Sequence, residues 1–221
     1  MRISVNIASL PEREEQLKRT VESLINQVDE VNICLNNYDQ NPFKGVEKVN
    51  VVFSNNALGD AGKFLFLDTF EGYYFSCDDD LIYSPTYIQD TIKEVDKYGV
   101  VSYHGRSFIK YPIESYYKSP AIRNRCLAKQ DFTEPVDIAG TGVMAFDTRK
   151  FKPNFGIFKR ANMSDIWISC YAKSQGVKIW GLKHSEDYFT YQEVPNTIYN
   201  DKVNSCEYET KIVNEYFFIT N

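Results

Sequence analysis

The sequence predicts an α/β fold, Rossmann-like, in which a mostly parallel central sheet carries helices on both faces. Short apolar segments typical of strands alternate with amphipathic segments typical of helices over the first hundred residues. The connections between these strands are long enough to contain a helix, as parallel pairing requires. Ligands of such sheets bind beyond the carboxyl ends of the strands. We therefore expect the functional residues to follow the strands.

The first predicted elements are a strand over residues 3–8 and a helix after it. Ser9 and Glu12, three residues apart with Pro11 between them, predict a capping box at the start of the helix. Apolar side chains then recur on one helical face and charged side chains on the other, so the helix is expected to pack on the sheet. The apolar ones are Leu17, Val21, Leu24, Ile25 and Val28.

Four more strands and two more helices follow in alternation. Residues 31–35 and 49–53 are predicted strands that end in asparagine-rich turns, and Gly59-Asp60 opens a second helix whose Phe64, Leu65 and Leu67 face the sheet. The remaining elements of this half are a strand over 73–77, a helix from Ser84-Pro85 to Gly99 and a strand over 100–103.

The second half of the chain is less regular. Residues 106–135 lack periodicity and are rich in tyrosine, proline and arginine, which predicts a long ordered loop or lid beside the cleft. A strand over 136–146, interrupted by glycines, a helix over 164–175 and a strand over 177–182 complete the sheet. The tail after His184 shows only a weak helical pattern near residues 207–216.

The composition limits the partners and the compartment. The 221 residues suffice for one large domain, and 25 basic against 30 acidic side chains give a formal net charge of −5, so we expect no nucleic acid partner. Five scattered cysteines without a Cys-x-x-Cys pair argue against a disulfide framework or a thiolate zinc site. No apolar run approaches the ~20 residues of a transmembrane helix. We expect a cytoplasmic protein without a transmembrane segment, peripheral association at the inner face of the membrane being a further option.

Three consecutive aspartates, Asp78, Asp79 and Asp80, follow the fourth predicted strand. Neighbouring carboxylates repel one another, and burial raises their pKa values unless a cation compensates. Because alternate residues of a strand point the same way, Asp78 and Asp80 can bind one metal ion while Asp79 points toward a sugar hydroxyl. The alternative is a solvated acidic turn, but charges attached directly to a buried strand favour a functional interpretation.

Three further residues are candidates for chemistry. His184 follows the last strand and could add a nitrogen ligand, a mixed set that suits Mn²⁺, with Mg²⁺ next; a surface or packing role is the alternative. His104 could contact substrate. Asp165 is either a carboxylate at a helix N-terminus, with Ser164 as the cap, or a general base. Gly140-Thr141-Gly142 and Ala145 match a dinucleotide-binding pattern, which we discount because no helix follows; the glycines instead allow close backbone approach to a sugar ring.

Four motifs in this order resemble those of GT-A nucleotide-sugar glycosyltransferases, most closely family 2, and the resemblance covers roughly residues 1–185. They are residues 7–13 after the first strand, Gly59-Asp60-Ala61-Gly62-Lys63, the three aspartates, and Ser164-Asp165. The resemblance implies a metal-dependent transferase that moves one sugar from a nucleotide-diphosphate donor, of the UDP-sugar type, to a hydroxyl acceptor. The acceptor would be a glycan or lipid-linked, as in surface polysaccharide or glycoconjugate synthesis.

The resemblance also implies a role for each motif. Residues 1–103 would form a nucleotide-binding half, residues 104–185 a half for the donor sugar and acceptor, and residues 186–221 a C-terminal extension packed on the domain. Asp165 would be the base of an inverting transfer. The implied nucleotide-site residues are Ala8, Ser9 and Arg13, with Asn36 or Asn37 at the base and Asp60 and Lys63 beside the nucleoside. The implied diphosphate, metal and donor-sugar residues are Asp78, Asp80, His184, Gly140, Thr141 and Gly142.

Two departures from the family pattern keep alternatives open. The second strand ends in Asn36-Asn37 where relatives carry an acidic turn, and the late helix has Ser164-Asp165 where an acidic pair is commoner. One alternative is a catalytically silent glycan- or nucleotide-binding subunit. The other is a sugar-1-phosphate nucleotidyltransferase, although that class needs a glycine-rich basic turn after the first strand and residues 8–13 contain no glycine.

Overall fold

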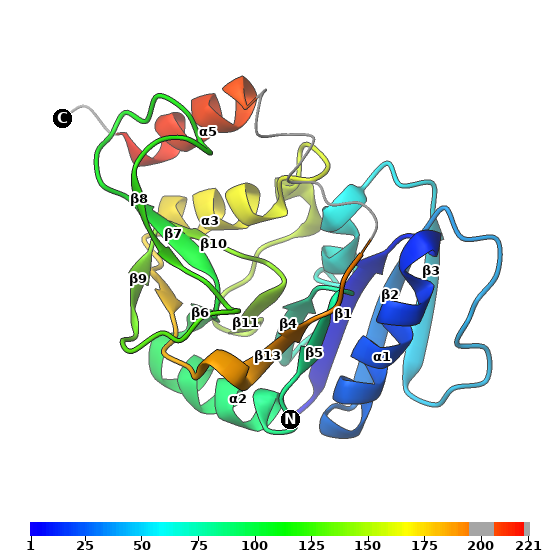
Figure 1. Cartoon of the computed structure of the whole chain (residues 1–221). Helices are drawn as coiled ribbons and strands as arrows, with labels where there is room; N and C mark the ends of the chain where they lie inside the picture. Colours follow the sequence, from blue (N-terminus) through cyan, green and yellow to red (C-terminus); the bar gives the residue numbers. More distant parts are fainter. Residues whose placement is uncertain (195–205, 219–221) are drawn as a thin grey trace.

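The computed structural model describes residues 1–194 and 206–218, and an eight-stranded sheet lies at its centre (Figure 1). Four of the seven strand pairs are parallel, and β11 runs antiparallel to both of its neighbours. The mostly parallel sheet predicted from the sequence is thus confirmed. Its strands, in order, are β3 (Val49–Ser54), β2 (Glu30–Asn36), β1 (Ile3–Ser9), β4 (Tyr73–Cys77), β11 (Val143–Asp147), β6 (Val100–Ser102), β12 (Ile179–Gly181) and β9 (Glu134–Val136).

Helices and two small sheets surround the central sheet. The α-helices are α1 (Glu14–Leu24), α2 (Tyr87–Tyr98), α3 (Ser164–Ser174) and α5 (Glu207–Phe217). One small sheet has the order β10 (Ile138–Ala139), β7 (Gly105–Phe108) and β8 (Ala121–Asn124), and the other pairs β13 (Phe189–Tyr191) with β5 (Leu81–Tyr83). Single-turn or short 3₁₀ helices are Pro11–Arg13, Ile25–Gln27, Gly59–Phe64, Phe155–Ile157 and Glu186–Tyr188.

The two faces of the sheet bury separate apolar cores. Because side chains of a strand alternate between faces, Tyr73, Phe75 and Cys77 of β4 join the core under α1 and α2, while Tyr74 joins the core under α3. Burying an aliphatic side chain such as Leu17 stabilises the fold by about 1.5–3 kcal/mol. A third core lies between α3 and α5, which are side by side at the top of Figure 1.

Several local predictions need correction. The predicted helix at Gly59 is a 3₁₀ helix of six residues, and the capping box is wrong because the Ser9 hydroxyl contacts Leu10 and Tyr38 instead of a helix amide. The interrupted strand over 136–146 is divided among three short strands that belong to two sheets. The segment 106–135 contains most of β7, all of β8 and part of β9, so it is more regular than the predicted loop.

The residues after His184 return to the domain at two places. The strand β13 pairs with β5, the strand that begins immediately after the three aspartates. The helix α5 packs on α3, and its Ile212 and Val213 are buried. The side-chain amide of Asn214 bonds the backbone of Ile113 in both directions. The predicted extension also includes residues 195–205 and 219–221, which lie outside the described residues. Within the described part of the chain, no helix combines the length and the apolar character needed to span a bilayer.

Candidate active site

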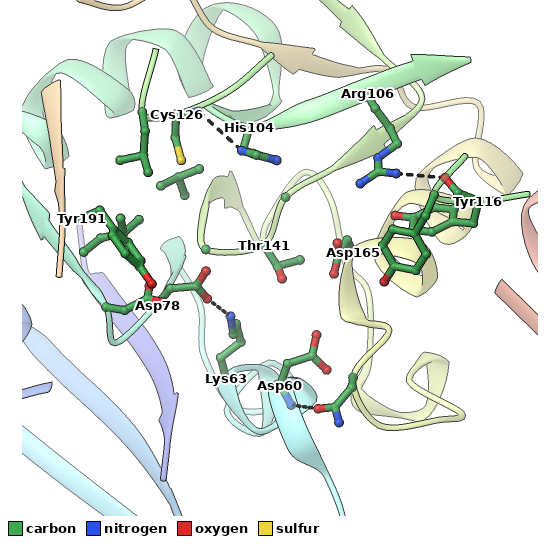
Figure 2. A pocket seen from close by; sticks show the side chains of 18 residues that line it. Asp60, Lys63, Asp78, His104, Arg106, Tyr116, Cys126, Thr141, Asp165 and Tyr191 are labelled. Atoms are coloured by element: carbon green, nitrogen blue, oxygen red, sulfur yellow. Dashed lines mark hydrogen bonds and ion pairs between the residues drawn. The ribbon is translucent and has the colours of Figure 1, made fainter. Parts of the chain in front are cut away.

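A cavity of about 370 Å³ lies beyond the carboxyl end of β4 (Figure 2). One side is formed by Asp78 and Asp80 and by the turn Gly140–Gly142, and the floor by the 3₁₀ helix Gly59–Phe64. Asp165 at the start of α3 lies on the opposite side with Arg106 and Tyr116, while His104 and Cys126 lie above, in the view of Figure 2. The position agrees with the rule that ligands bind beyond the carboxyl ends of parallel strands.

A second, smaller cavity of about 120 Å³ adjoins the first. The two share four lining residues, which are Asp60, Lys63, Asp78 and Asn162. The smaller cavity is otherwise formed by residues at the ends of β1 and β2, by Asn56 and Gly59, and by Asp79, the middle one of the three aspartates. Those predicted from the sequence are Ala8, Arg13, Asn36 and Asp79.

The three aspartates lie beside two basic side chains. The Asp78 carboxylate forms an ion pair with the buried ammonium of Lys63, whereas Asp79, which is buried, accepts a 3.0 Å hydrogen bond from Nη1 of Arg13. Asp80 lies 3.8 Å from the same Nη1. Burial and the charges of Asp78 and Asp79 raise the pKa of Asp80 to about 7. Burial alone would lower the pKa of Lys63, but Asp78 and Asp60 raise it above its usual value.

The turn Gly140–Gly142 fits closely against Asp78. A Cβ atom at Gly142 would lie 1.9 Å from a carboxylate oxygen of Asp78, so only glycine leaves room for that side chain. The backbone N–H of Asp78 donates to the carbonyl of Gly142 at 3.1 Å, and the Tyr83 hydroxyl donates to the same carbonyl at 2.5 Å. Thr141 contributes a hydroxyl 2.9 Å from that of Ser164. Gly142 therefore lets the backbone come close to a carboxylate, and the predicted approach of these glycines to a sugar ring stays a prediction.

Asp165 lies in the first turn of α3, and the Asp60 carboxylate accepts hydrogen bonds from the N-terminus of the same helix. The backbone N–H of Ser164 donates to Oδ2 of Asp60 at 3.1 Å, and the Ser164 hydroxyl bonds the same oxygen. Asp60, not Ser164 as predicted, is thus the residue that caps the helix. The other carboxylate oxygen of Asp60 is buried without a partner among the described residues. Burial and the neighbouring Asp60 raise the pKa of Asp165 to about 6.

The two histidines are placed differently from the prediction. His184 is buried away from the cavity, with Nδ1 3.0 Å from the carbonyl oxygen of Leu182 and Nε2 3.2 Å from that of Cys126. Its ring packs on Tyr103, so the predicted metal ligand is a packing residue here. His104 does line the cavity, and burial, together with Arg106, lowers its pKa to about 4.

Two predicted nucleotide-site residues lie outside both cavities. Ser9 is buried beside Tyr38, and Asn37 borders a shallow surface hollow with Tyr38, Asp39 and Phe53. Of the two asparagines considered for the base, only Asn36 lines the smaller cavity, where its side-chain amide donates to the carbonyl oxygen of Gly59 at 3.3 Å.

Sequence reasoning missed most of the side chains on the Asp165 side. Arg106, Tyr116, Tyr117 and Leu127 belong to the segment predicted as a lid, but nothing in their spacing singled them out. Tyr191 reaches the cavity because β13 pairs with β5, a contact between residues more than a hundred positions apart. The tyrosine- and arginine-rich composition of residues 106–135 was the one available signal.

The carboxylate oxygens of the site suit a divalent cation that is bound jointly by the protein and by a substrate. Asp78 and Asp80 line one wall, and two of their neighbouring carboxylate oxygens, Oδ1 of Asp60 and Oδ2 of Asp79, are buried without partners among the described residues. Five carboxylates face two basic groups, the half-buried Arg13 and the buried Lys63. Within residues 1–194 and 206–218, no three or more His, Cys, Asp and Glu side chains form a complete cage. Mg²⁺ and similar ions are commonly bound by one or two carboxylates plus substrate phosphates.

Comparison with known proteins finds solved structures with a similar fold, but no protein with a matching sequence. No family model matches the chain, and no curated protein matches it. A structure of S. aureus TarS 1-349 in complex with UDP-GlcNAc has a TM-score of 0.58 at 12% identity, with 89% of this chain and 60% of that chain covered. The chain thus spans less than two thirds of that fragment.

Two other solved structures match with similar scores. Glucosyl-3-phosphoglycerate synthase from Mycobacterium tuberculosis, in complex with Mn²⁺, UDP and glucosyl-3-phosphoglycerate, has a TM-score of 0.53 at 13% identity, covering 100% of this chain and 81% of that one. The 4-diphosphocytidyl-2C-methyl-D-erythritol synthase from Anaerococcus prevotii has a TM-score of 0.52 at 13% identity, covering 99% and 96%. The chain therefore shares the GT-A-like α/β fold of these solved structures, as its motifs predicted.

Proposed function

We propose that this chain is a metal-dependent glycosyltransferase that moves one sugar from a nucleotide-diphosphate donor, of the UDP-sugar type, to an acceptor hydroxyl. The observation that carries the proposal is the pair of adjoining cavities, with Asp78 at their junction. The smaller cavity would hold the nucleoside and the larger one the donor sugar and acceptor. A diphosphate between them would lie next to the carboxylates of Asp78 and Asp80.

Asp78 and Asp80 are the proposed residues for Mn²⁺ or Mg²⁺. A bound divalent ion would neutralise the negative charge that develops on a departing nucleoside diphosphate. The protein's own contribution is to hold the carboxylates in place: Lys63 fixes Asp78, and Arg13 lies beside Asp79 and Asp80. His184 is not included in this proposal because both of its ring nitrogens contact backbone carbonyls.

Asp165 is the proposed general base. It lies in the same cavity as the metal-site carboxylates but on the opposite side, which suits an attack on the sugar from the face away from the diphosphate and hence an inverting transfer. A base is most effective when its pKa is near the working pH, and burial together with Asp60 brings that of Asp165 to about 6. The carboxylate would take the proton from the acceptor hydroxyl as it attacks.

Titration calorimetry with UDP, with and without Mn²⁺, tests the donor site directly. We expect Mn²⁺ to strengthen UDP binding in the wild type and not in Asp80→Ala. The same variant should lose about two orders of magnitude in transfer rate, since one electrostatic contact to the transition state can be worth roughly 3 kcal/mol. Asp68→Ala, which removes an exposed carboxylate outside both cavities, is the control. Normal Mn²⁺-dependent transfer by Asp80→Ala would contradict the assignment.

One alternative enzyme class has a structural observation in its favour. The Anaerococcus prevotii synthase that matches the fold is covered almost completely, to 96% of its length, and its name describes a diphosphocytidyl product. A nucleotidyltransferase would consume a nucleoside triphosphate and release inorganic pyrophosphate, whereas the proposed transferase would consume a nucleotide sugar and release UDP. Incubation with each donor class, followed by assays for pyrophosphate and for UDP, separates the two. Absence of metal-enhanced binding to either donor would instead favour a catalytically silent subunit.

The wider setting of the proposal follows from the family resemblance. We propose a glycan or lipid-linked acceptor, in surface polysaccharide or glycoconjugate synthesis, with the protein in the cytoplasm or at the inner face of the membrane. Fractionation of cells and a screen of nucleotide sugars for Mn²⁺-dependent hydrolysis would test these points. Membrane association without a transmembrane segment should be reversed by high salt, because it would depend on electrostatic contacts.

A further inference from the structure

Arg106, on the side of the larger cavity away from Asp78, belongs to a basic segment. Between Gly105 and Gln130 the sequence has six basic side chains and one acidic one, in a chain whose formal net charge is −5. The metal-site carboxylates lie on the other side (Figure 2). The larger cavity therefore has the metal-site carboxylates on one side and Arg106, together with Asp165, on the other.

Two arginines of this segment are directly opposite each other on neighbouring strands. Arg106 of β7 is paired in register with Arg123 of β8. Like charges in such a pair destabilise a sheet, so the arrangement needs a compensating interaction. Part of it comes from backbone carbonyls: Arg106 donates to Tyr116 at 3.0 Å and Arg123 donates to Tyr117 at 3.2 Å. The Arg106 guanidinium also lies over the Tyr116 ring, 4.5 Å from its centroid.

Arg106 lies near enough to Asp165 to lower the pKa of that carboxyl, but it contacts no carboxylate directly among the described residues. Among the described residues, neither Arg106 nor Arg123 forms an ion pair, and the same holds for Arg125 nearby. Arg13 and Lys63, on the acidic side of the cavity, each contact a carboxylate. Arg106 makes its hydrogen bond through Nη1, and its guanidinium reaches the cavity, so Nη2 and Nε can still donate to a ligand. A guanidinium with two adjacent free donors suits a bidentate contact with a phosphate or carboxylate.

We propose that the acceptor is anionic, and that Arg106, with Arg123 beside it on β8, binds a phosphate or carboxylate group of it. The inference rests on the proposed function and adds the chemical class of the acceptor. Arg106 lies on the same side of the cavity as Asp165, so an anionic group held there places a neighbouring hydroxyl near the base. Tyr116 and Tyr117, which also line the cavity, would cover the acceptor carbon skeleton.

Binding of matched neutral and charged probes tests the proposal without using catalysis. Titration calorimetry compares glucose 6-phosphate with glucose, glycerol 3-phosphate with glycerol, and glucuronate with glucose, with UDP and Mn²⁺ present to fill the donor site and again without them. We expect at least one charged probe to bind about ten-fold tighter than its neutral partner, which corresponds to about 1.4 kcal/mol. The phosphate and carboxylate probes identify which anion is preferred.

The variants are Arg106→Gln and Arg123→Gln, each of which should reduce the preference to threefold or less. Arg106→Lys keeps the charge without the planar fork and should give an intermediate value. Arg19→Gln, which removes an exposed arginine from α1, is the matched control and should behave as the wild type. Equal binding of charged and neutral probes to the wild type, or a preference that survives in both glutamine variants, would overturn the proposal.

Two further measurements keep the result interpretable. Melting temperature and Mn²⁺-dependent UDP binding show whether Arg106→Gln still folds, since the lost contact with Tyr116 could destabilise the segment. If the wild type fails to bind UDP but retains a preference for the charged probe that depends on Arg106, the proposed donor is wrong and the anion site stands. If UDP binds with Mn²⁺ and the charged probe shows no preference, the donor site stands and the anionic acceptor is wrong.

Discussion

The Asp60 carboxylate links the stability of α3 to the acidity of Asp165, and two substitutions separate these effects. Asp60→Ala removes the acceptor for both the N–H and the hydroxyl of Ser164. Loss of a helix cap costs about 1 kcal/mol, and a buried donor left without a partner costs about 1–3 kcal/mol. We take about 2 kcal/mol, the lower end of the sum, because water that reaches part of the cavity can replace some of the lost hydrogen bonding. A domain of this size then melts about 4–8 °C lower.

Asp60→Asn keeps an acceptor oxygen for Ser164 but removes the negative charge. The melting temperature should therefore fall by less than half as much as in Asp60→Ala. Both variants should lower the pKa of Asp165, because the Asp60 charge disfavours ionisation of its neighbour. Asp165 is then deprotonated at lower pH, and the acid limb of the rate profile moves below about 6. Arg106 and Lys63, which lower the pKa of Asp165, are still present in both variants.

The assay is a carbon NMR titration of the Asp165 carboxyl, supported by the pH profile of donor hydrolysis. The control is Asp68→Asn, which changes an exposed carboxylate that accepts a hydrogen bond from the N–H of Phe155. This control should leave the titration of Asp165 unchanged. The reasoning is refuted if Asp165 titrates at the same pH in Asp60→Asn and in the wild type, or if Asp60→Ala melts at the wild-type temperature.

Two other predictions concern the same cavity. In the wild type, kcat/KM should rise with pH up to about 6 as Asp165 loses its proton. Asp165→Asn should abolish transfer but retain Mn²⁺-dependent UDP binding. Loss of UDP binding in this variant would place Asp165 in the donor site instead. Gly142→Ala should weaken Mn²⁺-dependent UDP binding at least tenfold, because the new methyl group would displace the Asp78 carboxylate, whereas Gly156→Ala meets only the end of the Asn154 side chain and should bind UDP normally. Unchanged UDP binding by Gly142→Ala would show that the position of Asp78 does not matter.

The sequence by itself determined the sheet and the acidic end of the site. Strands such as Tyr73–Cys77 are buried on both faces and are nearly continuous apolar runs, and the polar residues that follow them lie where parallel strands end. The alternation along Asp78, Asp79 and Asp80 also follows from backbone geometry alone: Asp78 and Asp80 line the larger cavity, whereas Asp79 lines only the smaller one, which Asp78 also borders. These features depend on neighbours in the chain, so a single sequence contains them.

Only the tertiary structure decided which residues face these aspartates. The helix cap at Ser164 comes from Asp60, more than a hundred positions earlier, and the basic side of the cavity depends on the register of β7 with β8. His184 shows that a local pattern can suggest a contact that the tertiary structure does not make. It follows a strand as a ligand would, but its ring nitrogens lie next to the backbone carbonyls of Leu182 and Cys126, and its ring packs among aromatic side chains. Contacts of this kind depend on packing between distant segments, which periodicity and local motifs do not encode.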